Sequence, residues 1–426
     1  MNRNRLVTLA AAAAALVLLG AGFMLGTGRS LVAWGPVRAV VFESDDWGLA
    51  GFIPDAQAWE GIDRTAVAPG RFPEVYWGST LEDSAGVAAL AKVLASVRGR
   101  DGLPAVLQPN YVMGSQDPEG DRWVVRLLPD LPPAYARPGL WTAVRLAERA
   151  GVWHPEFHAA WHYDPARRRE AALAPGAPRQ ATERGILLFP GSEQARELGP
   201  WRGREALAGE LDDALDSFTA LFGRPPGSII APDYTWNGRV EDLWQERGQT
   251  VIQAKREQRN PDLPHGRTGR VLKALDRRWS ALVHPGRIYL ERNCRFEPVQ
   301  SPDPAAVTRS CAAEVRRAWQ RGEPAIVETH RVNFAHTDPA VAAVGTAALG
   351  DLLAALAPGR PVFLVDSEVA ALQATGVSAR AVPGAGVIVR NLAHSRRPLA
   401  LPGGGVALIP AGASARIGRE GIVPIP

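Results

Sequence analysis

Short apolar runs that end abruptly in polar residues recur along most of the chain. The run at residues 37–42 is followed by ESDD, the run at 105–107 by QPN, and the run at 325–327 by ETH. The same pattern recurs at residues 151–153, 228–231, 250–252 and 362–365. Strands of parallel sheets are apolar throughout, and in α/β barrels functional residues gather at their carboxyl ends. The pattern predicts about seven parallel strands, with residues 287–290 as a further candidate strand.

Helical segments separate several of these runs. A helix is predicted at residues 81–97, because Ser79 to Glu82 has the spacing of a capping box. Helices predicted at 205–222, 240–247 and 304–321 each end at or next to a glycine, which readily forms a helix C-cap. Segments 128–138 and 171–184 show no clear period and are expected to be loops. Strands that alternate with helices predict an α/β fold, a distorted (β/α)7-type barrel.

The two ends of the chain differ from this pattern. Residues 6–25 form an uncharged apolar segment preceded by Arg3 and Arg5. A membrane-spanning helix needs about 20 such residues, whereas a cleaved signal peptide usually has an apolar core of about 7–15. We therefore expect residues 1–30 to be a signal peptide or membrane anchor, with an uncleaved anchor favoured. The rest of the chain is then extracytoplasmic, either membrane-anchored or secreted.

After about residue 378 the pattern of apolar and polar residues changes. Two short apolar runs, at 387–389 and 406–409, lie between turns rich in glycine and proline. We therefore expect the barrel to span residues 31–378 and a small β-rich appendage to span 379–426. The appendage contains no aromatic residue that could stack on a sugar, so a structural cap is favoured over a glycan-binding role.

Composition narrows the classes of function. The chain has 426 residues, of which 46% are hydrophobic and 22% charged, so it can bury a large core and is neither disordered nor a multi-span membrane protein. The net charge is +4, and the basic residues are scattered among acidic ones, so no nucleic-acid partner is expected. The only cysteines, Cys294 and Cys311, could form a disulfide outside the cytoplasm or remain as two buried thiols.

Three histidines lie four residues apart in GVWHPEFHAAWHYD: His154, His158 and His162. Two imidazoles on one zinc must each bring a nitrogen to about 2.0–2.1 Å from the ion. Residues four apart can do this on a helical turn, whereas on an extended strand they lie about 13 Å apart. Pro155 disfavours helical geometry at His154, which is therefore assigned to a strand end. His158 and His162 are the predicted ligands, on a turn that begins at His158.

Acidic and basic candidates follow two of the apolar runs. Asp45 and Asp46 come after the first run, where one carboxylate could bind a metal while the other accepts a proton. His330 comes after the run at 325–327 and could act as a general acid. Each has a plainer interpretation, since paired aspartates are common at helix N-termini and a histidine at a strand end is often structural.

Taken together, these motifs resemble the NodB-like polysaccharide deacetylase family of metal-dependent carbohydrate esterases, in particular a less characterised exported branch. The resemblance spans residues 37–366, and the motifs that carry it are SDDWG at 44–48, PEFHAAWH at 155–162, SIIAPDYTW at 228–236, RNCRFEP at 292–298 and THRVNF at 329–334. It implies a distorted barrel, in agreement with the strand pattern. It also implies hydrolytic removal of acetyl groups from an N-acetylated polysaccharide of the envelope or the extracellular space.

The resemblance also implies roles for individual residues. Asp46, His158 and His162 would hold a divalent metal, with zinc as the expected ion. Asp45 would be the catalytic base and His330 the general acid. A metal with three protein ligands keeps a position open for water and lowers the pKa of that water toward about 7.

Other site residues are less closely specified. The oxyanion would be held by the metal and by a backbone N–H near Tyr234. The motif APDYTW lacks the arginine that usually adjusts the base, and Arg331 and Arg292 are the candidate replacements. Residues placed to meet substrate hydroxyls or sugar rings could equally fix loops or fill the core; they are Trp47, Asn110, Trp161, Asp233, Tyr234, Trp236, Glu297, Arg331, Asn333 and Asp366.

Two other functions fit the same residues. A metal-dependent glycosidase could use the same type of barrel, and it would release sugar rather than acetate. A non-catalytic protein that binds glycan or assembles the envelope could keep the barrel without chemistry. The sequence leaves open which glycan is used and whether the acetyl group is on nitrogen or oxygen.

Overall fold

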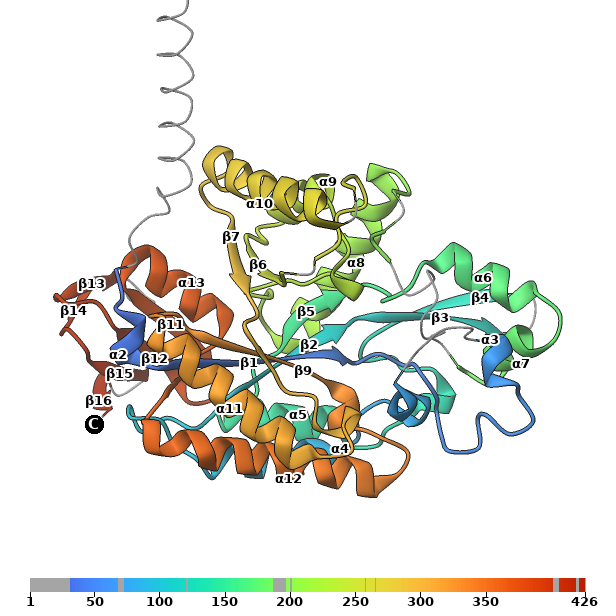
Figure 1. The fold of residues 1–426 in the computed structure, drawn as a ribbon, viewed down its shortest axis with the longest axis horizontal. Coiled ribbons are helices and arrows are strands. Elements are labelled where there is room, and N and C mark those ends of the chain that lie inside the picture. The colour runs from blue at the N-terminus through green and yellow to red at the C-terminus, as the bar shows by residue number, and fades with distance from the viewer. Residues whose placement is uncertain are drawn as a thin grey trace, which may run out of the picture.

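The computed structural model describes residues 31–67, 73–119, 122–186, 197–199, 201–256, 258–264, 266–400, 406–418 and 421–425 (Figure 1). The predicted membrane or signal segment, residues 1–30, lies outside the described residues. At the centre is a parallel sheet in the order β5-β2-β1-β9-β8, in which β10 pairs with the first residues of β1. Its strands are β1 (Ala39–Trp47), β2 (Leu107–Val112), β5 (Glu156–Ala159), β8 (Cys294–Arg295), β9 (Ala325–His330) and β10 (Val362–Phe363).

A second parallel pair continues this arrangement. β6 (Val251–Ala254) pairs with β7 (Ile288–Glu291), and single bridges from Ile229 to Phe157 and Ile252 connect β5 with β6. The chain then passes from β7 to β8, which pairs with β9. The fold is therefore a mixed α/β fold built on parallel strands, as predicted, and closure into a complete barrel stays a prediction.

The strands extend further into polar sequence than the apolar runs indicated. β1 continues through Asp46 to Trp47, and β9 continues to His330. The run at 151–153 contributes only a bridge from Trp153 to Leu107, and the strand itself begins at Glu156. Backbone pairing does not depend on side-chain polarity, so polar residues at strand ends remain in the ladder. Asp45, Asp46 and His330 therefore lie on strands.

Helices cover both sides of the sheet. α4, α5, α11 and α12 lie on one side, and α8, α9 and α10 lie toward the other (Figure 1). The α-helices are α2 (Trp34–Val37), α3 (Arg64–Val67), α4 (Ser84–Ala95), α5 (Leu140–Arg149), α6 (Pro165–Leu173), α7 (Ala177–Glu183), α8 (Arg204–Phe222), α9 (Gly238–Glu246), α10 (Gly266–Val283), α11 (Pro304–Gln320), α12 (Pro339–Leu356) and α13 (Asp366–Thr375). The short 3-10 helices are η1 (Glu74–Gly78), η2 (Pro133–Tyr135), η4 (Pro232–Tyr234), η5 (Pro298–Gln300), η6 (Arg331–Asn333) and η7 (Ala357–Gly359).

One helix prediction was wrong in detail, and one loop prediction was wrong. The helix predicted at 81–97 begins at Ser84, because the side chain of Asp83 accepts a hydrogen bond from the Gly86 N–H and forms the N-cap. The segment 171–184, predicted to be a loop, contains the end of α6 and most of α7. α7 buries Ala181 in a small apolar cluster with Trp59, a distant contact that leaves no period in so short a segment.

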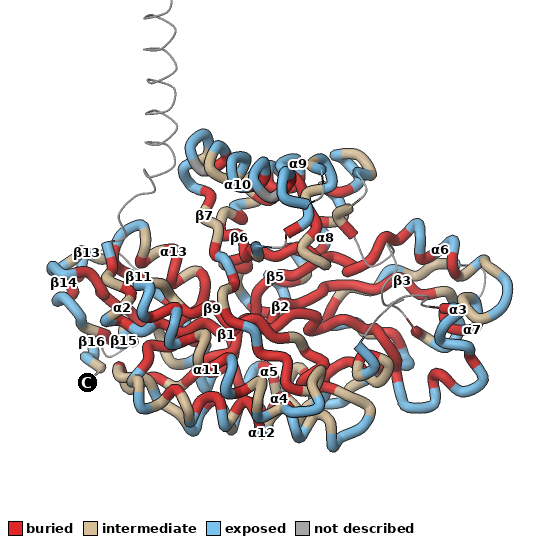
Figure 2. Tube along the Cα trace, viewed as in Figure 1, coloured by how far each residue is buried: buried red, intermediate tan, exposed pale blue. Residues whose placement is uncertain are grey.

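The largest apolar cluster lies along the central strands, which are buried along their length (Figure 2). One described helix, α12, is long and apolar enough to cross a membrane by length and composition. It packs against α4 and α11 and contributes Leu349, Leu352 and Leu353 to the main core. This packing is that of a core helix.

Two smaller β units extend the central fold. β3 (Gly114–Glu119) and β4 (Arg122–Leu127) form a hairpin in the long interval between Asp46 and His158. At the C-terminus, an antiparallel sheet contains β11 (Val377–Val382), β12 (Gly386–Asn391), β15 (Ser414–Gly418) and β16 (Gly421–Ile425), beside the pair β13 (Arg397–Ala400) and β14 (Val406–Ile409).

Buried ion pairs attach the C-terminal sheet to the rest of the fold. Arg390 of β12 is fully buried and forms ion pairs with Asp101, at 2.8 Å, and with Glu368. Elsewhere, Cys294 and Cys311 are both buried and both free thiols in the structure. Of the two interpretations of the cysteines, the structure therefore has the buried thiols.

Candidate metal and catalytic site

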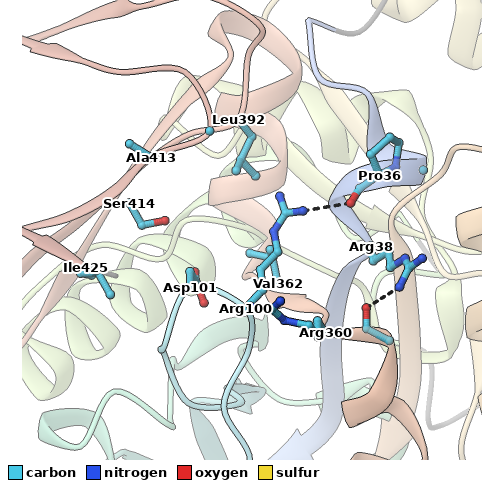
Figure 3. Close-up of a pocket in the computed structure, with 13 residues that line it drawn as sticks. Pro36, Arg38, Arg100, Asp101, Arg360, Val362, Leu392, Ala413, Ser414 and Ile425 are labelled. Carbon is cyan, nitrogen blue, oxygen red and sulfur yellow. Dashed lines mark hydrogen bonds between the residues drawn. The ribbon is translucent and has the colours of Figure 1, made fainter.

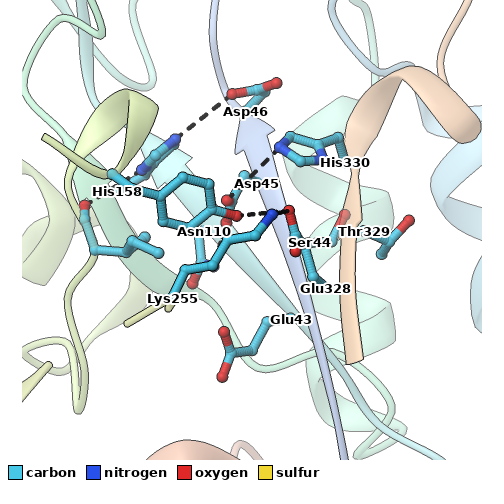
Figure 4. A network of polar contacts seen from close by, with 12 residues as sticks. Glu43, Ser44, Asp45, Asp46, Asn110, His158, Lys255, Glu328, Thr329 and His330 are labelled. Carbon is cyan, nitrogen blue, oxygen red and sulfur yellow. Dashed lines mark hydrogen bonds and ion pairs between the residues drawn. The ribbon is translucent and has the colours of Figure 1, made fainter. Parts of the chain in front are cut away.

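The end of β1 brings Asp46 to the two predicted histidine ligands. Oδ1 of Asp46 lies 3.0 Å from Nε2 of His162 and 3.5 Å from Nε2 of His158. All three residues are buried, and their ligand atoms lie within 4.8 Å of one another. Asp46 adopts a left-handed backbone conformation (φ 72°), which aspartate tolerates better than most residues. Figure 4 shows the Asp46 carboxylate turned toward His158.

The two histidines meet by a route that the sequence did not predict. His158 lies on β5, not at the start of a helical turn, and the chain bends immediately after the strand. His162 has a left-handed conformation (φ 64°), which returns its ring toward His158, with 4.8 Å between the ring centroids. A bend can thus bring residues four apart together as a helical turn does. The predicted turn was wrong, although the predicted pair does converge.

Glu197 holds this bend and was missed by the sequence analysis. Its buried carboxylate accepts hydrogen bonds from three successive backbone N–H groups, those of Ala160 (3.2 Å), Trp161 (2.9 Å) and His162 (2.7 Å). Burial raises the pKa of Glu197, and the N–H groups oppose this rise by stabilising the carboxylate. Glu197 therefore fixes the backbone that carries the second histidine.

The ring nitrogens of His158 have distinct surroundings. Nδ1 lies 3.3 Å from the carbonyl oxygen of Ile230, which suits a protonated Nδ1. Nε2 then carries the lone pair and faces Asp46, as in metal sites where a backbone carbonyl orients the ligand. His154 lies outside this cluster, with its Nε2 3.2 Å from Oε1 of Glu156, and burial lowers the pKa of His154 well below its usual value.

Asp45, the predicted base, is held by a bidentate arginine. Arg292 donates from Nη1 to Oδ2 of Asp45 at 2.6 Å and from Nη2 to Oδ1 at 2.7 Å. Asn110 donates to Oδ1 of the same carboxylate at 2.7 Å. Of the two arginines proposed for this place, Arg292 occupies it. Arg331 instead donates to the backbone carbonyls of Leu49 and Gly51 in the loop after β1.

The charge state of Asp45 follows from this contact. Burial by itself would raise its pKa, but the Arg292 guanidinium outweighs burial and lowers the pKa well below the usual value. Arg292 also pairs with the fully buried Glu43. Asp45 is therefore a carboxylate throughout the neutral range.

His330 lies beside Asp45 on the neighbouring strand. The two residues are register partners between β1 and β9, and Nε2 of His330 is 3.9 Å from Oδ2 of Asp45. Nδ1 of His330 is 2.5 Å from Oε1 of Glu297, whose other oxygen accepts a hydrogen bond from Asn333 at 2.7 Å. Burial lowers the pKa of His330, but Glu297 and the two aspartates outweigh it and raise the pKa to about 10.

Replacing Glu297 with glutamine is expected to lower the pKa of His330 in the metal-free protein toward its ordinary value of 6.5. In the wild type the raised pKa stabilises the folded protein at pH values below 6.5, and this contribution is lost as the pH rises through about 10. NMR titration of the ring measures the pKa of His330, and urea unfolding across this pH range measures the stability. Glu323→Gln, at a half-exposed carboxylate, is the control. An unchanged His330 pKa in Glu297→Gln would contradict the assignment.

A second network of hydrogen bonds lies next to Arg292. Glu328 accepts hydrogen bonds from the Tyr234 hydroxyl at 2.8 Å and from Nζ of Lys255 at 2.7 Å, and Arg292 donates to the same hydroxyl at 2.6 Å. Glu297, Glu328 and His330 also form a second group whose side chains could hold a metal ion. The first group offers two imidazole nitrogens, the donors that zinc favours, while His330 is held in its protonated form.

The predicted oxyanion contact near Tyr234 is not formed by the N–H of Tyr234 itself. That N–H donates to the carbonyl of Ala231 at 3.2 Å. The η4 turn gives both Asp233 and Tyr234 a positive φ and directs the Tyr234 hydroxyl toward Arg292 and Glu328. The side chain of Tyr234 therefore lies in the site, while its backbone N–H is used within the turn.

Most residues predicted to meet a substrate lie beneath the site. Trp47 and Trp236 are buried, and their indole N–H groups donate to Ser44 and Glu241. Asn110 is fully buried between Asp45 and Gln253 and donates a hydrogen bond to each.

The remaining candidates divide between the core and the surface. Arg331 is fully buried, Trp161 is also buried, and Asp366 accepts hydrogen bonds from Gln108 and Ser228 below the site. Asp233 is partly exposed and pairs with Arg259 at 2.6 Å. These positions exclude sugar stacking by the buried tryptophans, because no ring face reaches solvent.

A separate cavity of about 840 Å³ lies at the opposite end of β1, between α2, η7 and the C-terminal sheet (Figure 3). Arg38, Arg100 and Arg360 line it. Arg100 donates to the carbonyl of Pro36 at 3.0 Å, and Arg38 donates to that of Gly359 at 2.8 Å. The cavity shares no residue with the metal cluster.

Comparison with known proteins gives distant similarities only. No protein-family model matches the chain, and no curated protein matches it. Several solved structures are similar to it, and three of them are described here. A Mycobacterium smegmatis structure named as a polysaccharide deacetylase has 13% identity and a TM-score of 0.40, over 79% of this chain and 90% of that chain. Agd3, described as a novel carbohydrate deacetylase, has 12% identity and a TM-score of 0.39, over 88% and 60%. IcaB from Ammonifex degensii has 11% identity and a TM-score of 0.21, over 53% and 88%. Similarities at this level assign neither a family nor an activity to the chain.

Proposed function

We propose that this chain is a metal-dependent hydrolase that removes acetyl groups from an N-acetylated polysaccharide outside the cytoplasm. One observation carries the proposal. A buried cluster of one carboxylate and two histidines lies beside a second carboxylate, Asp45, that is held ionised and a histidine, His330, that is held protonated. Metal-assisted hydrolysis of an amide needs this combination of a metal site, a proton acceptor and a proton donor.

The donor set suits a divalent metal. Asp46, His158 and His162 offer one oxygen and two imidazole nitrogens, the ligand types of catalytic zinc, and the bound ion would polarise the acyl oxygen and acidify water. The Nδ1 contact of His158 with Ile230 leaves its Nε2 free to bind. We therefore propose zinc as the metal.

The protein groups then account for the proton transfers. Asp45 takes a proton from the attacking water, while Arg292 and Asn110 keep its carboxylate in place. A new C–O bond forms at the acyl carbon, and the C–N bond breaks. His330 gives its Nε2 proton to the departing amine, and Glu297 holds Nδ1 so that Nε2 points toward Asp45. Acetate and a free amino sugar result.

Metal content and acetate release test this proposal together. The purified 426-residue chain, prepared without chelator, should contain about one zinc per chain. The double variant His158→Ala, His162→Ala should contain almost none and release no acetate from N-acetylated hexosamine oligosaccharides. His154→Ala is the matched control, because His154 is a buried histidine on the same segment and lies outside the cluster.

The other outcomes distinguish the alternatives. Release of shortened sugars without acetate would identify a glycosidase on the same fold. A folded wild-type protein that takes up no metal even when zinc is supplied would contradict the mechanism and favour a non-catalytic glycan-binding protein.

A further inference from the structure

Helix α10 presents apolar side chains to solvent. It connects β6 to β7 and lies along an outer edge of the molecule (Figure 1), where its trace is largely exposed (Figure 2). Val271, Trp279 and Leu282 are each 60% exposed. The large exposed hydrophobic residues of α10 are Val271, Leu272, Leu275, Trp279, Leu282 and Val283.

These six residues form one continuous face. At about 100° per residue they occupy an arc of roughly 120° of the helix circumference. Arg267 and Arg278 border the arc on one side, and Asp276 borders it on the other. The face is therefore apolar along its centre and mainly basic at its margin.

The opposite side of α10 is polar and attaches the helix to the protein. Lys273 is buried and donates to the backbone carbonyls of Arg256 and Gln258. Arg277 pairs with Glu291 at the end of β7. A surface helix of a globular protein normally buries its apolar face, so α10 has the reverse orientation. Exposed apolar surface of this kind marks a site of contact with a membrane or another protein.

The position of α10 indicates which contact it makes. β7 follows α10 directly, and Ile288 and Leu290 of β7 pack in one apolar cluster with Val32 and Trp34. Residues 26–31 connect this cluster to the apolar segment at 6–25, and even when fully extended this connection is no longer than about 25 Å. If that segment spans a bilayer, α10 is held close to the bilayer surface.

We propose that the exposed face of α10 inserts into the interface of a phospholipid bilayer. Trp279 and the aliphatic side chains enter the boundary between headgroups and acyl chains, and the exposed Arg267 contacts anionic headgroups. The proposal rests on the expected anchor and does not depend on the hydrolase activity. Two attachments, the anchor and α10, would fix the orientation of the catalytic site relative to the membrane.

A probe placed on α10 in the 426-residue chain tests the proposal. Leu282→Cys, labelled with an environment-sensitive fluorophore, is reconstituted in vesicles of phosphatidylglycerol and phosphatidylcholine. Leu146→Cys on α5 is the matched control, because Leu146 is 59% exposed and lies on another helix. Cys294 and Cys311 are buried, and labelling of the unmodified chain measures their contribution.

The expected result is a blue-shifted emission at position 282, quenched several-fold more by lipids brominated in the acyl chain than the emission at position 146. Equal, water-like emission at both positions would overturn the proposal. A blue shift at position 282 in detergent that grows with protein concentration would also overturn it, since the face would then contact a second copy of the chain.

A variant of the same face separates membrane contact from catalysis. In Leu275→Gln, Trp279→Gln, quenching of the probe at position 282 should fall to the level of the control. Zinc content and acetate release of detergent-solubilised protein should stay at wild-type values. If the wild-type protein contained no zinc or released no acetate, the proposed function would be contradicted, and the result for α10 would still stand.

Discussion

Replacing Asp45 with asparagine is expected to lower kcat for acetate release by about 10²–10⁴-fold, the usual contribution of general acid–base catalysis. Asparagine has nearly the same shape and still accepts a hydrogen bond from Arg292, but it cannot take a proton from water. The metal should remain bound, because Asp45 is not among the three clustered ligand residues. Steady-state kinetics and elemental analysis of the same preparation measure both quantities.

Asp46→Asn is the matched control for this experiment. It changes the neighbouring carboxylate in the same way, but it weakens a ligand to the metal, so zinc content should fall together with activity. If Asp45→Asn kept wild-type kcat, Asp45 would not be the base. If Asp45→Asn lost zinc as Asp46→Asn does, the division of tasks between the two aspartates would be wrong.

Replacing Arg292 with methionine is expected to destabilise the folded protein by about 3–5 kcal/mol, the cost of breaking a buried ion pair by removing one partner. The Arg292 side chain is 1% exposed and pairs with both Glu43 and Asp45. Without it, the main group that opposes the effect of burial is lost, and we expect the pKa of Asp45 to rise above its usual value. Urea unfolding at neutral pH measures the change in the free energy of unfolding.

The pH dependence of this loss follows from the direction of the Asp45 shift. In the wild type, a lowered pKa contributes stability that is present above the usual pKa of 3.8 and is lost as the pH falls through the lower, folded-state value. In Arg292→Met we expect the pKa of Asp45 in the folded protein to lie above 3.8, so ionisation of Asp45 then lowers stability instead of raising it. The variant should therefore lose more stability at pH 7 than at pH 4. Arg295→Met, at an exposed position on β8, should change stability by less than about 0.5 kcal/mol. Equal stability of Arg292→Met and Arg295→Met would contradict the role given to Arg292.

Several parts of the site could be predicted from local sequence. The apolar run before Asp45 and Asp46 predicts a buried strand, and the structure has β1 there, with both aspartates on its last residues. The run before His330 is likewise part of β9, the strand beside β1. Parallel strands place their carboxyl ends at the same edge of a sheet, so the meeting of these residues follows from the fold class.

The contacts that tune these residues could not be predicted in the same way. Arg292 reaches Asp45 across 247 residues of sequence, and nothing near either residue distinguishes Arg292 from Arg331. Glu197 lies 35 residues from His162 and holds its bend through backbone N–H groups, which any residue supplies. The bend itself depends on a left-handed conformation at His162, which only a few per cent of residues other than glycine adopt, so the sequence does not predict it.

The sequence by itself determined most of the central parallel strands, several of the helices, and which strand ends carry carboxylate and histidine side chains. Periodicity and capping act between near neighbours, so they leave a local pattern. Only the tertiary structure decided that Arg292 holds Asp45, that Glu297 holds His330, that most of the tryptophans in the motifs are core residues, and that α10 turns its apolar face outward. These outcomes depend on which surfaces pack together, and packing joins residues that are far apart in the chain.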